Sequence, residues 1–424
     1  MRSEYFKQKR GSYSGLWGRW QEGRGRMAPR FRTLILLAIG LILAPAAGRA
    51  QGDWQQRVLA KVQNGTVLAV DEKGRILFSH QADKAFVPAS TLKVPTALAA
   101  LAILGENYRY KTDFFLDGSG NLYVKGYGDP FLISEELTLI AAQLKAKGLK
   151  SVNNMVLDGS YFGPDVQVPG LAGSLNPYDA YNGALLANFN TINIIKSGGE
   201  VRSAEEQTPM TEITRLLAAN APNGKSRINV ATHEREAALY PGYLLKEFLA
   251  QQGVAVAGSI ALGAVSPSAK PFLSYVSSKS LRQVLEAALK YSQNLIMNQL
   301  TLTMGAVKFG PPASLAKAKK ALADFLAQEV GLRDFNVEEG SGISRKNHIT
   351  ALEMDKVLVK FFPYYQLLPV KNGMWVKTGT LSGVSGLVGY FQSKSHGWVR
   401  FTIILNQASN QRDEIAQLLF ENLQ

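Results

Sequence analysis

The 424-residue chain has no cysteine and only four histidines. Without cysteine, disulfides, thiol nucleophiles and cysteine-ligated zinc sites are excluded. A zinc-protease helix is also excluded, because Ala237 stands where the second histidine after His233-Glu234 is required. A Ser-His-Asp hydrolase has little support, since no Gly-x-Ser-x-Gly sequence occurs, and there is no glycine-rich phosphate loop. We therefore expect no metal and no other cofactor.

Long hydrophobic runs are also lacking. One apolar run, Leu34 to Ala47, has fourteen residues, fewer than the roughly 20 that a membrane span needs. Basic residues precede it, and the small residues of Gly48-Arg49-Ala50 follow it, a pattern typical of a cleavable export signal. The sequence therefore predicts a signal peptide over residues 1–50, with Met27 as a candidate true start, and an exported, periplasmic protein. An uncleaved anchor is the alternative.

Positive charge exceeds negative charge, but the leader accounts for much of the excess. The formal net charge is +14, and residues 1–50 hold ten Lys/Arg against two Asp/Glu, which leaves +6 for the remainder. So modest a charge suits an anionic wall polymer or a membrane surface at least as well as nucleic acid. No zinc knuckle, basic helical run or aromatic-basic signature is present. We expect no nucleic-acid partner and at most peripheral membrane association.

Three short motifs supply a chemistry that does not need histidine. They are, in chain order, Ser90-Thr91-Leu92-Lys93, Ser292-Gln293-Asn294 and Lys377-Thr378-Gly379. Together they offer a nucleophile, a candidate base, polar positioning groups, and a cation on a strand able to bind a carboxylate. These are the parts required for acyl transfer through a serine.

The first motif has a decoy, so its context must decide. Ser314 and Lys317 have the same spacing as Ser90 and Lys93. The residues after Lys93 are apolar on all sides, which predicts a buried helix with both side chains on one face of its first turn. The residues after Lys317 form an amphipathic pattern with a lysine face. We therefore favour Ser90 and Lys93, and expect Lys317 to be a solvated charge.

The other two motifs are also placed by their surroundings. Ser292 lies in a run with helical periodicity, Leu281 to Leu302, which predicts one helix. Lys377 lies in a short run of strand-forming residues, Met374 to Thr380. Gly379 would let a ligand or another backbone approach that strand closely.

The order of expected elements predicts an α+β fold. Residues 65–70 and 75–78 form a predicted hairpin, and strands are expected again near the C-terminus, followed by an amphipathic helix with Ile415, Leu418, Leu419 and Leu423. Strands at both ends imply one antiparallel sheet, flanked by helices and assembled from distant parts of the chain. Residues 108–272 are richer in glycine, asparagine and short strand-like runs, which predicts an insert of mostly β character.

The motifs and their surroundings resemble the penicilloyl-serine transferases. Within that group the chain is similar to the class C, low-molecular-mass penicillin-binding proteins, which are D-alanyl-D-alanine carboxypeptidases and endopeptidases. The resemblance covers nearly all of the chain after the leader. About two hundred residues separate Ser90 from Ser292, like this class, whose extra domain lies between those motifs. Departures are Glu339, where the family has aspartate, and Ile343, where it has leucine.

The resemblance implies a β-lactamase/transpeptidase-like catalytic domain over 51–107 and 273–424, with the inserted domain at 108–272. It implies that Ser90 attacks the carbonyl of a penultimate D-alanine of a peptidoglycan stem peptide, and that penicillin and other β-lactams acylate the same serine. Burial and the nearby Lys377 should lower the pKa of Lys93, which could then accept the serine proton. Whether Lys93 is the acylation base stays open.

The remaining roles also come from the resemblance. Ser292 would pass a proton to the leaving amine, and Asn294 would orient the substrate amide. The backbone N–H groups of Ser90 and Thr380 would form the oxyanion hole. The substrate's terminal carboxylate would be held by Lys377, Thr378 and Thr380, with Gly379 between the two threonines.

Two further residues and two rival functions complete the expectations. Arg345 matches an arginine near the family's site, with a structural ion pair as the alternative. Asp158 matches an acidic residue of the insert that grips the amine of a diaminopimelate side chain, with a surface turn as the alternative. The rivals are a β-lactamase and a non-catalytic wall-binding protein on the same scaffold. The sequence does not separate carboxypeptidase from endopeptidase action.

Overall fold

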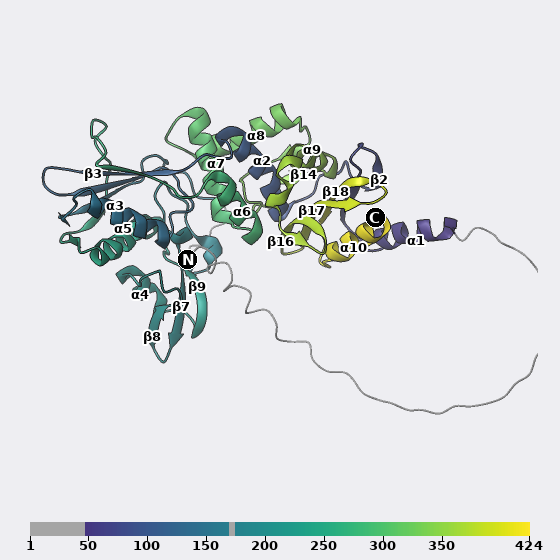
Figure 1. Ribbon diagram of the computed structural model, residues 1–424. Helices are drawn as coiled ribbons and strands as arrows, with labels where there is room; N and C mark the ends of the chain where they lie inside the picture. The colour runs from purple at the N-terminus through teal and green to yellow at the C-terminus, as the bar shows by residue number, and fades with distance from the viewer. Residues whose placement is uncertain (1–46, 169–173) are drawn as a thin grey trace, which may run out of the picture. The chain divides into compact units, whose positions relative to one another are not determined.

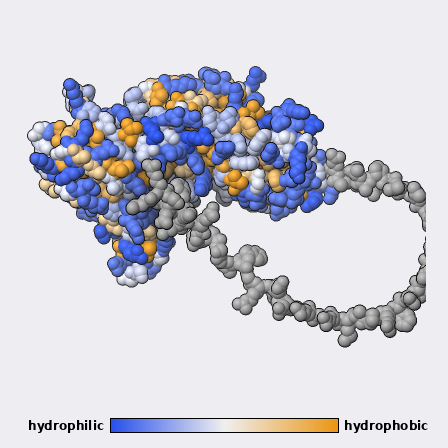
Figure 2. Space-filling model, in the orientation of Figure 1, coloured by the Kyte–Doolittle hydropathy of each residue, from blue (hydrophilic) through white to orange (hydrophobic). Residues whose placement is uncertain are grey.

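The computed structural model describes residues 47–168 and 174–424 (Figure 1). The predicted leader, with its candidate start at Met27, lies outside the described residues except for its last four positions, which begin helix α1. No helix in the described part is both long and apolar enough to cross a membrane. On the face drawn in Figure 2, hydrophilic and hydrophobic residues are interspersed.

The first structural unit is a six-stranded antiparallel sheet with the strand order β15-β16-β17-β18-β1-β2. Strand β1 pairs with β18, from Gly65 opposite Leu405 to Val70 opposite Arg400. This pairing confirms the prediction that the two ends of the chain share one sheet. The strands are β1 (Gly65–Val70), β2 (Ile76–His80), β15 (Val370–Lys371), β16 (Met374–Leu381), β17 (Val384–Ser393) and β18 (Gly397–Leu405).

Helices cover both faces of this sheet. Successive residues of a strand point to opposite faces, so Leu387 packs into the core beside α1 and α10 while Val388 packs into the larger core that includes α2. The closing helix α10 is amphipathic as predicted and buries Ile415 and Leu419. The helices are α1 (Ala47–Leu59), α2 (Lys93–Leu104), α6 (Leu281–Tyr291), α7 (Asn294–Phe309), α8 (Leu315–Phe325), α9 (Ala351–Phe361) and α10 (Arg412–Asn422).

Short elements connect these helices and strands. They are the 3₁₀ turns η2 (Ala89–Leu92) and η6 (Phe362–Leu367), the π turn η5 (Leu326–Val330), and the two-residue strands β13 (Phe335–Asn336) and β14 (His348–Ile349). The predicted buried helix after Lys93 is confirmed. Helix α2 buries every residue from Lys93 to Leu101.

The insert contains a five-stranded sheet in the order β11-β6-β4-β3-β12, a three-stranded sheet in the order β8-β7-β9, and a parallel pair of β5 and β10. Its strands are β3 (Lys111–Leu116), β4 (Leu122–Gly126), β5 (Ser151–Val152), β6 (Met155–Asp158), β7 (Thr191–Ser197), β8 (Glu200–Ser203), β9 (Gly224–Asn229), β10 (Ala255–Val256), β11 (Ile260–Leu262) and β12 (Leu273–Val276). Its helices and turns are α3 (Ser134–Ala146), α4 (Glu212–Ala218), α5 (Glu234–Gln251), η3 (Pro177–Asp179) and η4 (Asn188–Asn190).

Two features of the insert differ from the sequence prediction. It is not mostly β, because helices α3 and α5 pack on its core and provide the crossovers that the parallel pairs β4–β6 and β6–β11 require. Its far boundary also lies later than 272, since β12 pairs with β3 inside the five-stranded sheet. Apolar periodicity reports burial but not which sheet a short strand joins, so the sequence could not place β12.

Candidate active site

Ser90 lies on the turn η2, immediately before α2. The residue before it, Ala89, has a φ of 49°, a left-handed conformation that is uncommon for a side-chain-bearing residue and often marks a functional site. The Thr91 hydroxyl donates to the Pro88 carbonyl at 2.7 Å and fixes this turn. Ser90 is half-buried, whereas its neighbours Ala89 and Thr91 are fully buried.

Lys93 is the first residue of α2 and is fully buried. Its Nζ lies 2.8 Å from Ser90 Oγ, 2.7 Å from Asn294 Oδ1 and 2.6 Å from the Ser341 carbonyl. Ser90 and Lys93 therefore meet on one face of the first turn, as predicted, and the contact with Asn294 brings the second motif to the same amine. Burial and the neighbouring Lys377 hold the pKa of Lys93 well below its ordinary value, against the opposing charge of Glu339. An amine with a lowered pKa, in contact with a hydroxyl, is suited to remove its proton.

Ser292 corrects the prediction of one helix from Leu281 to Leu302. Helix α6 ends at Tyr291, Ser292 adopts a left-handed φ of 53°, and α7 begins at Asn294. The periodicity continued across the break because both helices pack against the same core. The break places the hydroxyl of Ser292 beside the third motif, where Lys377 Nζ donates to it at 2.9 Å.

Lys377 lies on β16 and is almost fully buried. Its amine also donates to the Thr378 carbonyl at 2.8 Å. Burial, with a contribution from the charge of Arg412, lowers the pKa of Lys377 to about 8. Thr378 and Thr380 lie one and three positions after Lys377 on the same strand, so their side chains leave the opposite face of the strand from that of the lysine. Both threonines are more exposed to solvent than Lys377.

Gly379 allows the first and third motifs to meet. A Cβ atom at this position would lie 2.8 Å from the Pro88 carbonyl oxygen and 2.9 Å from the backbone nitrogen of Ser90. Any side chain would therefore push β16 away from the nucleophile turn. The prediction that this glycine permits a close approach of another backbone is confirmed.

A family model matches nearly all of the described chain, over residues 53–201, 185–370 and 367–421. The chain belongs to the D-Ala-D-Ala carboxypeptidase 3 (S13) family. The predicted class, a serine-type D-Ala-D-Ala carboxypeptidase, is thereby confirmed at the level of the family.

Individual proteins that are similar to this S13 chain are also D-alanyl-D-alanine carboxypeptidases. It is 25% identical over 476 residues to a D-alanyl-D-alanine carboxypeptidase of an Actinomadura species, covering 91% of this chain and 88% of the relative. It is 24% identical to the D-alanyl-D-alanine carboxypeptidase DacB of Haemophilus influenzae, with 88% and 91% covered. The crystal structure of penicillin-binding protein 4 from Haemophilus influenzae superposes with a TM-score of 0.72 at 21% identity, covering 87% of this chain and 99% of that one. The predicted α+β fold is confirmed.

Glu339 is one residue whose importance the sequence did not reveal, although its departure from the family pattern was noticeable. Its buried carboxylate accepts hydrogen bonds from Ser341 N and Oγ, both at 2.6 Å, and from Gly342 N and Asn347 Nδ2, both at 2.7 Å. These bonds fold the loop whose Ser341 carbonyl contacts Lys93. Glu339 therefore positions the base candidate without touching the nucleophile.

Arg412, the first residue of α10, is the other residue that sequence reasoning missed. Its Nη1 donates to the hydroxyl of Thr380 at 2.8 Å and to the carbonyls of Gly379 and Gly386. The guanidinium thus lies against the predicted carboxylate-binding strand and adds positive charge beside Lys377. Nothing local marks it, because Arg412 follows the third motif by more than thirty positions and stands in a polar, turn-like segment.

Replacing Arg412 by glutamine should raise the pH at which kcat/KM falls on the alkaline side of its pH profile. The positive charge of Arg412 helps to hold the pKa of Lys377 at about 8. Without it, Lys377 should keep its proton to a higher pH, and the alkaline limb of kcat/KM should move the same way. The limb is measured from the rate of acylation between pH 6 and 10. Arg412→Lys, which keeps the charge, should leave the limb near pH 8, and a limb that stays there in Arg412→Gln contradicts this interpretation.

The structure does not bring the remaining two candidates into the cluster of motif side chains. Arg345 donates through Nη2 to the Ser382 carbonyl, at the turn between β16 and β17, and makes no ion pair with any described residue. Its predicted alternative, a structural ion pair, is therefore wrong for the described chain. Its role at the site stays a prediction.

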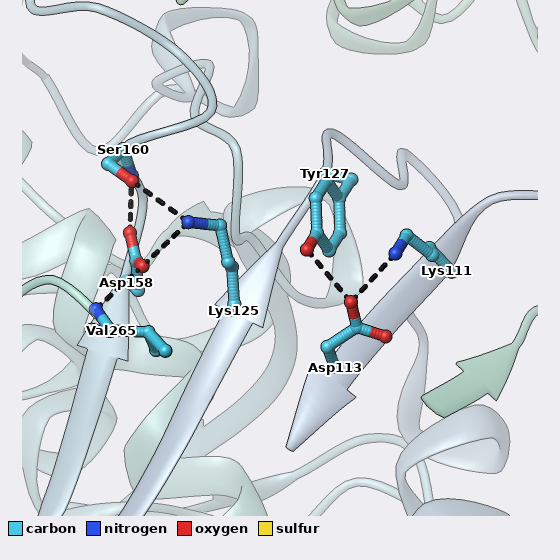
Figure 3. A network of polar contacts seen from close by, with 7 residues as sticks. All are labelled: Lys111, Asp113, Lys125, Tyr127, Asp158, Ser160 and Val265. Carbon is cyan, nitrogen blue, oxygen red and sulfur yellow. Dashed lines mark hydrogen bonds and ion pairs between the residues drawn. The ribbon is translucent and has the colours of Figure 1, made fainter. Parts of the chain in front are cut away.

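Asp158 ends β6 in the insert and is fully buried, so the alternative of a surface turn is wrong. Its carboxylate contacts Lys125 Nζ at 3.0 Å, Val265 N at 2.9 Å and Ser160 N at 2.8 Å (Figure 3). Burial works to raise the pKa of Asp158, but these hydrogen bonds outweigh it and lower the pKa. An amine of the chain itself thus occupies the carboxylate that was predicted to grip a substrate amine, and that role also stays a prediction.

The decoy Ser314 has a structural role. It is the N-cap of α8, where its hydroxyl accepts a hydrogen bond from Lys317 N. Lys317 Nζ points instead to the carbonyls of Gly310 and Pro312, at 2.7 and 2.8 Å. The prediction that Lys317 is merely a solvated charge is wrong in detail, since it fixes the loop before its helix, but this amine is not directed at Ser314.

Proposed function

We propose that this S13 chain cleaves the terminal D-Ala-D-Ala bond of peptidoglycan stem peptides through an acyl-enzyme on Ser90. The observation that carries the proposal is the contact of 2.8 Å between Ser90 Oγ and the Nζ of the fully buried Lys93. A surface lysine would be protonated at neutral pH and could not take the serine proton. Burial beside Lys377 favours the neutral amine of Lys93, which can.

In the acylation step, Lys93 accepts the proton of Ser90 as Oγ attacks the carbonyl carbon of the penultimate D-alanine. The oxyanion is held by the backbone N–H groups of Ser90 and Thr380, a role supported by the close approach of Gly379, the residue before Thr380, to the backbone nitrogen of Ser90. The intermediate then collapses and the C–N bond breaks, and the leaving amine takes, through Ser292, the proton that Lys93 had accepted, which returns Lys93 to its neutral form. Water then attacks the ester carbonyl while Lys93 accepts its proton, and Lys93 passes that proton to Ser90 Oγ as the ester C–O bond breaks. Asn294, which contacts Lys93, orients the amide of the acyl donor.

The third motif recognises the free carboxylate of the terminal D-alanine. Lys377 supplies charge, and Thr378 and Thr380 supply hydroxyl donors on the accessible side of β16. Arg412 steadies Thr380 and adds a second cation. Charge-assisted hydrogen bonds to a carboxylate are stronger than neutral ones, so this group should account for much of the substrate affinity.

β-Lactams are the second class of ligand in the proposal. The solved structures similar to this chain include the Haemophilus influenzae penicillin-binding protein 4 in complex with a β-lactam, at a TM-score of 0.67, and a Bdellovibrio bacteriovorus endopeptidase acylated by penicillin G, at a TM-score of 0.50. The same Ser90–Lys93 pair would open the lactam ring. The substrate and the apolar run before residue 48 together support export to the periplasm.

Digestion of purified substrates distinguishes the two bonds that the enzyme could cleave, the terminal D-Ala-D-Ala bond of a stem peptide and the cross-link between two stem peptides. A synthetic peptide ending in D-Ala-D-Ala should release free D-alanine, and a cross-linked muropeptide dimer should yield monomers if the enzyme is also an endopeptidase. Mass spectrometry identifies both products. Benzylpenicillin serves as the control, because a penicillin-binding protein should be acylated once and regenerate slowly. Sustained penicillin turnover without D-alanine release would instead identify a β-lactamase, and peptide binding without any cleavage would identify a wall-binding protein.

A further inference from the structure

Lys93 needs a defined orientation if its neutral amine is to take the proton of Ser90. A neutral amine has two N–H bonds and one lone pair, and only the lone pair accepts a proton. Asn294 Oδ1 and the Ser341 carbonyl, 2.7 and 2.6 Å from Lys93 Nζ, are oxygens that can only accept hydrogen bonds. They take both N–H bonds, so the lone pair is directed at Ser90 Oγ, 2.8 Å away. With either oxygen displaced, the amine would be free to rotate its lone pair away from the serine.

The Ser341 carbonyl belongs to residues 339–342, which we call the carbonyl loop. The loop is anchored to both helices that carry the neighbouring motif residues. From α2, Thr96 Oγ1 donates to the Gly340 carbonyl at 2.8 Å, and Gly340 N donates to Asn298 Oδ1 of α7 at 2.9 Å. Each anchor lies about one helical turn after the motif residue of its own helix. The loop therefore keeps a fixed position relative to the first two motifs.

The carbonyl loop also packs directly against the nucleophile turn η2. Gly342 has a φ of 85°, and a Cβ atom there would lie 2.0 Å from the Ala89 carbonyl oxygen. Any side chain would push the loop away from the turn, and the Ser341 carbonyl would move away from Lys93 with it. The glycine after Ser341 thus fixes the distance between that carbonyl and the base.

Glu339 holds the carbonyl loop from within. Its Oε2 accepts from N and Oγ of Ser341, both at 2.6 Å, so the carboxylate is bonded to the residue whose carbonyl faces Lys93. Its Oε1 accepts from Gly342 N at 2.7 Å. Glu339 also acts through its charge. Burial and the charge of Lys377 lower the pKa of Lys93, and the charge of Glu339 raises it.

We propose that the carbonyl loop aims the lone pair of Lys93 at Ser90 during acylation, with Glu339 and Thr96 as its positioning residues. The inference rests on the proposed function. When Oγ attacks, the O–H bond of Ser90 breaks and the lone pair of Lys93 forms the new N–H bond. The resulting ammonium keeps two of its N–H bonds on the same two oxygens, and the third carries the proton that is passed on to the leaving amine. The negative charge of Glu339 stabilises this ammonium, so Glu339 sets both the direction and the strength of the base.

The first test is Glu339→Gln, assayed on a peptide ending in D-Ala-D-Ala from about pH 4 to 10. The value of kcat should fall by about 10–10²-fold, the scale of loss when a reacting group is misplaced by about 1 Å. KM should stay unchanged, because the orientation of the base matters only in the transition state. Loss of the charge should also lower the pKa of Lys93 and move the rising limb of kcat/KM to lower pH. A variant that is merely less stable would lose activity without moving this limb.

Two variants serve as controls. Glu339→Asp keeps the charge on a side chain shorter by one methylene, so the rising limb should stay in place and kcat should fall less than in Glu339→Gln. Glu136→Gln removes a buried carboxylate of the insert, one that accepts from Tyr275 Oη at 2.6 Å and from Ser278 N at 2.9 Å. This variant should lower the melting temperature but leave kcat and the rising limb at their wild-type values.

Thr96→Val keeps the test decisive if circular dichroism shows that Glu339→Gln does not fold. It removes one anchor of the carbonyl loop without changing a charge. Its kcat should therefore fall by about three- to tenfold, the effect of one hydrogen bond, with KM and the rising limb unchanged.

A wild-type kcat in folded Glu339→Gln or in Thr96→Val overturns the role of the carbonyl loop. A fall in kcat with an unmoved limb in Glu339→Gln, or an equal loss of kcat in Glu136→Gln, does the same. Absence of both D-alanine release and penicillin labelling from the wild type overturns the proposed function and this inference together.

Discussion

Replacing Ser90 by alanine is expected to abolish covalent labelling by penicillin and to lower D-alanine release by about 10⁴-fold or more, the scale of loss when an enzyme loses its nucleophilic serine. The fold should tolerate the change. Ser90 is half-buried on a turn, and the turn is held by the Thr91 hydroxyl rather than by that of Ser90. The measurement is intact-protein mass spectrometry after incubation with benzylpenicillin, together with peptide mapping of the labelled wild type.

The matched control is Ser314→Ala, because Ser314 belongs to the second Ser-x-x-Lys sequence of the chain. Its hydroxyl caps α8, so its loss should cost roughly 1 kcal/mol of stability and leave labelling intact. Label on the peptide that contains Ser314, or full labelling of Ser90→Ala, would refute the assignment of the nucleophile.

Replacing Lys93 by methionine is expected to have the next largest effect, a fall of about 10²–10⁴-fold in the acylation rate, which is the usual contribution of a general base. Methionine has a similar length and fits a buried position. It removes the amine that contacts Ser90 Oγ, Asn294 Oδ1 and the Ser341 carbonyl. Lys317→Met is the control from the second Ser-x-x-Lys sequence and should leave the rate unchanged.

The pH dependence of Lys93→Met separates a base from a merely structural lysine. In the wild type the neutral fraction of Lys93 increases with pH, so kcat/KM should rise through a pKa well below the ordinary lysine value. It should fall again near pH 8, where Lys377 loses the charge that attracts the substrate carboxylate. The variant should lose the rising limb and keep the falling one. If the variant keeps both the rising and the falling limb of the kcat/KM profile, or if its acylation rate falls less than tenfold, Lys93 is excluded as the acylation base.

Part of this geometry was predictable because it depends on neighbours in the chain. Ser90 and Lys93 are three positions apart, and a helical turn of any kind puts such a pair on one side. The apolar residues after Lys93 indicated burial on every side, which is also why the pKa of Lys93 is lowered. Gly379 is a similar case, since a glycine in a strand signals close approach of another backbone wherever that backbone comes from.

Other parts depended on contacts between distant segments. Ser292 and its neighbours have the periodicity of one helix, yet the helix breaks there. Ser292 is left-handed between α6 and α7, and its hydroxyl accepts a hydrogen bond from Lys377, a residue far along the chain. Arg412 lies far along the chain from Thr380 and contacts it only because α10 packs on the sheet. Asp158 shows the same limit: the family resemblance implied that it binds a substrate amine, and in the structure the amine of Lys125 lies 3.0 Å from its carboxylate.

The sequence alone determined the kind of chemistry available to this protein, the contact between Ser90 and Lys93, and the antiparallel sheet that joins the two ends of the chain. These follow from local periodicity, side-chain chemistry and the absence of cysteine and phosphate-loop motifs. The tertiary structure alone decided that Arg412 lies beside Thr380 and Lys377 on β16, and where the insert ends. Burial, pKa and charge complementarity arise from groups that are close in space but separated along the chain, and no local pattern records that proximity.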